Sequence, residues 1–140
     1  MEKNELIAWE SKCVQEEAPE CTSTCPLHVD ARLFLKEIRK GDWGAAYKVL
    51  SKTMPFPGIL GRICDHPCEE RCKRNLVGGS IAIGALERLC VEKYAGKKRV
   101  QPLPRKSQRI AVLGGGLSGV TSALDLLKKG FAVSLFEAAD

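Results

Sequence analysis

The sequence predicts a mainly α fold in two parts: a helical domain over residues 1–100, a linker over 101–108, and a truncated, Rossmann-like βαβ unit over 109–140. Three observations support this division. All seven cysteines lie between Cys13 and Cys90. Apolar residues in that region recur at helical spacing, and a basic, proline-containing stretch then leads into a strand, glycine turn, helix and strand pattern.

Two helices are expected in the first half of the helical domain. The first runs from residue 29 to residue 41, and its apolar face carries Leu33, Phe34 and Ile38. Asp42 is suited to cap the second helix, which is expected to run through Leu50. The apolar side of this second helix carries Trp43, Ala46, Tyr47 and Leu50. Residues 54–58 contain two prolines and a glycine, which predicts a turn or loop.

Two further helices are expected in the second half. Pro67 suits the first turn of a short helix that carries Cys68 and Cys72. Paired glycines then break the chain, and Ser80 is expected to cap a helix over residues 81–94. The apolar positions of that helix are Ile83, Leu86, Leu89 and Cys90.

The C-terminal part reads as one βαβ unit. Residues 109–113 and 131–136 are short runs rich in apolar, β-favouring residues, which predict two strands. Residues 117–129 between them predict a helix, with Gly130 just past its end.

Composition and charge exclude several classes of protein. No apolar run approaches the length of a membrane span, and residues 1–12 lack the apolar core of a secretory signal, so a cytoplasmic location is the expectation. The net charge of +5 is mild, and the basic residues are scattered apart from residues 97–106, which prolines interrupt. That stretch is interpreted as a solvated linker rather than a patch for nucleic acid. Neither a nucleic acid nor a membrane is therefore expected as a partner.

The cysteines predict a metal or cluster site rather than disulfides. Their number is odd, no secretory signal is seen, and a reducing cytosol opposes disulfides. The sequence Cys21-x3-Cys25-Pro26 copies the end of the bacterial ferredoxin run, whose last cysteine serves a second cluster. Cys68 and Cys72, four residues apart on a helix, would face one site or two adjacent ones.

Zinc is the alternative metal. Structural zinc sites favour Cys-x2-Cys spacing, which this sequence lacks. His28 and His66 are available as nitrogen ligands, although His66 is expected to start the short helix that follows it. Iron–sulfur ligation is therefore favoured over zinc.

The glycine turn indicates dinucleotide recognition. Gly114, Gly116 and Gly119 form a G-x-G-x-x-G that follows a strand and opens a helix, and Glu137 ends the next strand. These glycines allow the tight turn, the approach of a pyrophosphate to the backbone and close helix–strand packing, while the acid takes a ribose hydroxyl. The motif alone does not separate FAD from NAD.

The sequence resembles a known family over nearly its whole length: the N-terminal iron–sulfur domain of the glutamate synthase small (β) subunit, shared with dihydropyrimidine dehydrogenase. The phrases that carry the resemblance are Cys21-Thr-Ser-Thr-Cys25-Pro26, Gly61-Arg-Ile-Cys64-Asp-His-Pro-Cys68-Glu-Glu-Arg-Cys72 and Ile81-Ala-Ile-Gly-Ala-Leu-Glu87-Arg88. The family continues into an FAD-binding βαβ unit, as this sequence does. The resemblance therefore favours FAD at the glycine turn.

The resemblance also implies two [4Fe–4S] clusters and their ligands. One cluster would be held by Cys13, Cys21 and Cys72, and the other by Cys25, Cys64 and Cys68. The fourth ligand of the second cluster can be an oxygen on the last helix, and that position matches Glu87. The fourth ligand of the first cluster is a cysteine in the family, whereas this sequence has Glu16 there. That cluster would then be oxygen-ligated, three-iron, labile or missing. Cys90 is interpreted as a buried apolar residue rather than a ligand.

The function implied is electron relay. In the family, NADPH bound by a later domain reduces FAD, and electrons pass through the clusters to a larger catalytic or electron-accepting subunit. Because residues 109–140 cover only the start of a flavin domain, the chain is expected to be inactive alone. Its exposed apolar strands are expected either to pair with a second copy or to be poorly ordered. The alternatives are a non-enzymatic docking or adaptor module and a zinc-stabilised helical domain.

Overall fold

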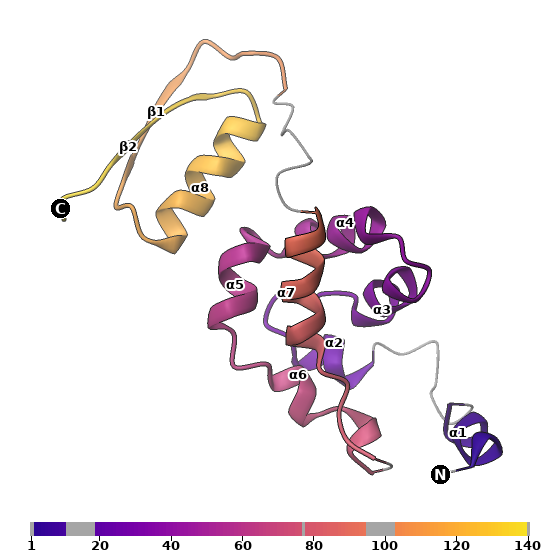
Figure 1. Cartoon of the computed structure of the whole chain (residues 1–140). Coiled ribbons are helices and arrows are strands. Elements are labelled where there is room, and N and C mark those ends of the chain that lie inside the picture. The colour runs from indigo at the N-terminus through magenta and orange to yellow at the C-terminus, as the bar shows by residue number, and fades with distance from the viewer. Residues whose placement is uncertain (1, 11–18, 77, 95–102, 140) are drawn as a thin grey trace. The chain divides into compact units, whose positions relative to one another are not determined.

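The computed structural model describes residues 2–10, 19–76, 78–94 and 103–139. The chain divides into two compact units, residues 1–95 and 96–140, which are considered separately (Figure 1). In the part of the chain that the structure describes, no helix combines the length and the apolar character needed to span a bilayer.

The first unit is helical, as the sequence predicts. Its elements are α1 (Lys3–Glu10), α2 (Glu20–Thr24), α3 (Ala31–Arg39), α4 (Trp43–Thr53), α5 (Pro57–Ile63), α6 (Pro67–Glu70), the 3-10 turn η1 (Lys73–Leu76) and α7 (Ile83–Tyr94).

Helices α3 and α4 form where the sequence places them, because each begins at an aspartate cap. The Asp30 carboxylate accepts a hydrogen bond from the backbone N–H of Leu33 at 2.9 Å, and Asp42 does the same for Ala45 at 2.8 Å. Phe34 is fully buried. The prediction for Leu33 is wrong, since 41% of it is exposed. The buried stripe of α3 runs through positions 31, 34, 35 and 38, at helical spacing, and position 33 lies off it.

Helix α5 was not expected from the sequence. The prediction of a loop over residues 54–58 is wrong at its end, because the helix already begins at Pro57. Proline is favoured at the first helical position, where its fixed φ suits the helix and its missing N–H has no intrahelical partner. The Pro-Gly pair therefore starts a helix here instead of extending the loop.

Helix α6 is shorter than expected and ends at Glu70, so Cys72 lies outside it. The side-chain amide of Asn75 donates to the carbonyl oxygens of Glu69 and Glu70 at 3.0 and 3.1 Å. These bonds satisfy carbonyls at the end of the helix, and the chain then turns into η1. The prediction that Cys68 and Cys72 share one helical face is therefore wrong.

Helix α7 lies between α4 and α5 and packs on both (Figure 1). It begins at Ile83, two residues later than predicted. The core of this unit is formed by Val29, Ala31, Phe34, Ala46, Leu50, Met54, Cys68, Ile83 and Cys90.

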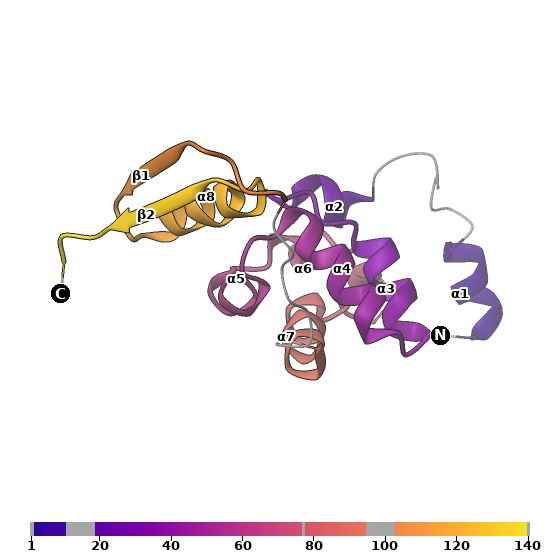
Figure 2. The same cartoon turned by 90° about the horizontal axis from the view of Figure 1, so that it is seen from above.

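The second unit is the predicted βαβ unit. Strands β1 (Arg109–Leu113) and β2 (Ala132–Phe136) are parallel neighbours, with Arg109 opposite Ala132 and Leu113 opposite Phe136. Helix α8 (Leu117–Lys128) connects them and lies along one face of the two-stranded sheet (Figures 1 and 2).

Candidate functional site

Three cysteines and one glutamate from four different segments come together in the helical unit. Burial, followed by the negative charges of Glu87, Cys25, Glu69 and Cys64, raises the pKa of the Cys68 thiol to about 12. Cys25 also packs against the core cluster that contains Cys68, and helices α2 and α6 are in contact. Cys25 follows α2, Cys64 follows α5, and Cys68 lies on α6. We call Cys25, Cys64, Cys68 and Glu87 the inner group.

Cys21 and Cys72 belong to the other set of expected ligands. Burial, with a smaller contribution from the charge of Cys72, raises the pKa of the Cys21 thiol. Cys72 lies beyond the end of α6, the helix that carries Cys68. Cys13 and Glu16, the other residues expected here, lie outside the described residues.

Glu87 is a buried acid, not a solvated one. It is 6% exposed on α7, and burial, together with the charge of Glu69, raises the pKa of its carboxyl to about 7, although Arg88 acts in the opposite direction. Helix α5 comes close to it at Gly61, where an added Cβ would lie 3.8 Å from the Glu87 Oε2 atom. A carboxyl group in such surroundings needs a partner that offsets the loss of water.

His66, between Cys64 and Cys68 in the chain, has a ring nitrogen without a partner within the described residues. Its Nε2 atom is buried and makes no hydrogen bond there. An unsatisfied buried polar atom costs roughly 1–3 kcal/mol. Its backbone N–H donates to the Cys64 Sγ atom at 3.3 Å. As predicted, the short helix starts directly after His66.

The side chains of the inner group fit an iron–sulfur cluster. Thiolates are the usual ligands of such clusters. Within the described residues, no three His, Cys, Asp or Glu side chains are close enough to hold a single metal ion. Ligands of a four-iron cluster bind different irons and therefore stand further apart than the ligands of one ion. The buried Glu87 carboxyl would supply an oxygen in this otherwise sulfur-rich group.

The glycine turn adopts the backbone conformation that its three motif glycines predict. Gly114 has a φ of +101°, a left-handed value that favours glycine. A Cβ added at Gly119 would overlap the carbonyl oxygen of Gly114, whereas one at Gly116 would meet no atom within 4 Å. The side of the turn at Gly116 is thus open for a phosphate, and α8 begins there without a side-chain cap.

Glu137 lies beside this turn. Its carboxylate accepts hydrogen bonds from the backbone N–H groups of Gly115, Ala138 and Ala139, which lower its pKa. The structure therefore brings Glu137 to the glycines, as expected for an acid that would take a ribose hydroxyl.

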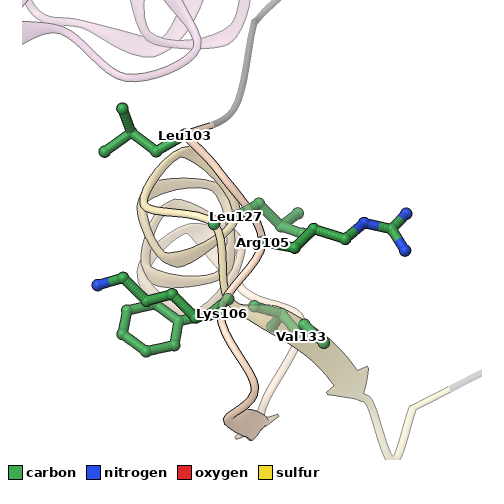
Figure 3. A pocket seen from close by; sticks show the side chains of 8 residues that line it. Leu103, Arg105, Lys106, Leu127 and Val133 are labelled. Atoms are coloured by element: carbon green, nitrogen blue, oxygen red, sulfur yellow. The ribbon is translucent and has the colours of Figure 1, made fainter.

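A hollow of about 380 Å³ lies at the opposite end of the βαβ unit (Figure 3). It is lined by Leu103, Arg105, Lys106, Leu127, Gly130, Phe131, Ala132 and Val133. These residues surround the amino end of β2, whereas dinucleotides bind at the carboxyl ends of parallel strands. The hollow therefore lies at the other end of the unit from the expected dinucleotide site. No sequence pattern indicated it, because it forms where the segment before β1 folds back on the end of α8.

Comparison with known proteins identifies the family to which the helical unit is similar. Residues 1–99 match the family described as dihydropyrimidine dehydrogenase domain II, 4Fe-4S cluster. The glutamate synthase (NADPH) small chain of Bacillus subtilis is 33% identical over 122 residues, covering 85% of this chain and 25% of the relative. The same enzyme chain of Mycobacterium tuberculosis is 31% identical over 133 residues, covering 93% of this chain and 27% of the relative.

A third relative has a different name. The NADPH-Fe(3+) oxidoreductase subunit beta of Geobacter sulfurreducens is 30% identical over 121 residues, covering 84% of this chain and 18% of the relative. The chain thus spans between 18% and 27% of the length of these three relatives.

Proposed function

The chain belongs to the dihydropyrimidine dehydrogenase domain II family of 4Fe-4S cluster domains, and we propose that it is the electron-transfer domain of an NADPH- and FAD-dependent oxidoreductase of the glutamate synthase small-subunit type. The family match and the sequence relatives support the cluster domain.

We assign the inner group, Cys25, Cys64, Cys68 and Glu87, to one [4Fe–4S] cluster. Cys13, Cys21 and Cys72, with Glu16, are assigned to a second cluster. A bound [4Fe–4S] cluster takes up and releases one electron at a time.

The protein side chains give the inner group a buried and an open side. Cys68 and Glu87 are buried, whereas Cys64 is exposed. Burial lowers the local dielectric constant and so changes the relative stability of oxidised and reduced forms of a bound cluster. The solvent-facing side at Cys64 offers a route by which electrons reach a partner.

The βαβ unit is assigned to FAD in the complete oxidoreductase. Gly116 and the start of α8 would face the pyrophosphate, and Glu137 would bind the ribose. NADPH would bind a further domain, and the electron acceptor would be a larger subunit. The relatives are themselves named as a small chain or a subunit beta, which supports this assignment.

The gathering of Cys25, Cys64 and Cys68 around the buried Glu87 carries this proposal. The test is an anaerobic purification followed by determination of iron, acid-labile sulfide and zinc. Iron and sulfide in similar amounts are expected, and Cys68→Ser should lower both. Cys90→Ser changes a cysteine on α7 outside the inner group and is the matched control. Its iron and sulfide contents should equal those of the wild type. Stoichiometric zinc without sulfide would contradict the proposal and favour the zinc-stabilised alternative.

A further inference from the structure

The first turn of α7 is tied to the segment that carries Cys64 and Cys68. The Glu69 Oε1 atom accepts a hydrogen bond from the backbone N–H of Gly84 at 2.8 Å. Gly84 is the second residue of α7, where backbone N–H groups lack an intrahelical partner. Glu69 thus caps the helix from a distant part of the sequence, the role expected of Ser80.

A second contact joins the first turn of α7 to the segment between Cys64 and Cys68. The His66 imidazole packs directly on Gly84, and a Cβ at that position would overlap its ring. His66 is held in a left-handed backbone conformation, with a φ of 55°. Helix α7 can approach this closely only because position 84 has no side chain.

Both contacts lie one helical turn from Glu87. Residues three apart on a helix share a face, so Gly84 and Glu87 lie on the same side of α7. The far side of the Glu87 carboxyl is bounded by α5, where Gly61 lies close and the Arg88 Nη1 atom donates to the Gly61 carbonyl at 3.3 Å. A shift of α7 by one residue would move Glu87 about 1.5 Å along the axis and turn it by about 100°.

We propose that Glu69 and His66 are positioning residues for Glu87: by holding the first turn of α7, they set the register at which the Glu87 carboxylate reaches the cluster of the inner group. This inference rests on the proposed function, because it requires a cluster at Cys25, Cys64 and Cys68. It assigns no ligand role to Glu69 or His66 themselves.

The experiment compares Glu69→Ala and Gly84→Ala with Glu87→Ala in the full chain, purified anaerobically. A four-iron cluster that loses its only non-thiolate ligand loses the iron bound there and becomes a three-iron cluster, which electron paramagnetic resonance distinguishes in the oxidised state. Glu69→Ala and Gly84→Ala should each show the same three-iron signal as Glu87→Ala and should each lose about one iron per chain. The signal of the cluster at Cys21 and Cys72 should be unchanged.

Two further variants separate positioning from general stability. Glu70→Ala removes the neighbouring, exposed acid of the same short helix and should leave the spectrum of the wild type. In Gly84→Ala, the added substitution His66→Ala removes the ring that the new methyl group would overlap. The hydrogen bond from the backbone N–H of position 84 to Glu69 can then form again, and part of the four-iron signal should return.

The outcomes distinguish this inference from the proposed function. Wild-type protein without sulfide would overturn the proposed function and this inference with it. Wild-type protein with clusters, but with unchanged spectra for Glu69→Ala and Gly84→Ala, would overturn the positioning role alone. Loss of both clusters in these two variants would also overturn it, since that result indicates unfolding rather than a displaced ligand.

Discussion

The Cys90 Sγ atom on α7 lies 3.7 Å from the carbonyl oxygen of Trp43 at the start of α4, and the Cys90 side chain is fully buried. Burial, together with the charge of Glu87, raises the pKa of this thiol to about 11. The Cys90 thiol thus donates to a carbonyl inside the core and packs there as a small apolar residue. The expectation that Cys90 is a buried apolar residue is confirmed.

Cys90→Ala should lower stability without changing the cluster content. The substitution leaves a small gap between α4 and α7 and removes one weak hydrogen bond, at a cost of about 1 kcal/mol. Urea unfolding monitored by circular dichroism measures this change, and iron and sulfide determination should give wild-type values. A loss of iron comparable with that of Cys68→Ala would assign Cys90 to the cluster after all.

Replacing Glu16 by cysteine should strengthen the cluster assigned to Cys13, Cys21 and Cys72. A thiolate is the better ligand for iron–sulfur chemistry than a carboxylate, and the family has a cysteine at this position. Iron content after exposure to air should be higher in Glu16→Cys than in the wild type. Glu17→Cys, with its thiol one residue away, is the matched control and should bring no gain. Equal iron retention in all three proteins would show that position 16 does not face the cluster.

The order of the βαβ unit should fall at acidic pH because of Glu137. Hydrogen bonds from backbone N–H groups lower the pKa of this carboxyl below its ordinary value of 4.5. A lowered folded-state pKa gives stability that is present above 4.5 and is lost as the pH falls through the folded pKa. Hydrogen-exchange protection of residues 109–136 should therefore decrease in that range. Glu137→Gln should remove most of this dependence, whereas Asp125→Asn, on the exposed side of α8, should retain it.

The apolar end of the sheet should cause self-association. Leu113 is 82% exposed at the end of β1, and Leu135 and Phe136 at the end of β2 are also exposed. Exposed apolar strand residues at an open sheet edge promote pairing with another chain. Leu113→Lys should reduce the dimer fraction in analytical ultracentrifugation. Leu103→Lys makes the same change at the other end of the βαβ unit and is the control. It should leave the dimer fraction unchanged. A monomeric wild type would contradict this prediction.

The sequence alone was sufficient where the determining contacts are local. Asp30 and Asp42 cap helices within three residues of themselves, and the glycine turn dictates its own backbone path. The βαβ unit followed from the same kind of pattern, since its strands, turn and helix each have a short-range signature. The cysteine spacing likewise indicated an iron–sulfur domain before any fold was known, and the family match confirms it.

Only the tertiary structure decided which residues meet. The Cys68 thiol is affected by the charge of Glu87, and Cys72 lies outside its helix, because α6 ends at Glu70 and the start of α7 is bonded to Glu69. The start of α7 is capped by Glu69, fifteen residues before Gly84 in the chain. The local capping rule that pointed to Ser80 cannot anticipate a cap from that distance in sequence. The physical reason is that helix capping and ligand gathering here depend on side chains distant in sequence, whose approach is decided by the packing of the whole unit. Local pattern determines which elements form, and packing determines how far each one runs and what it faces.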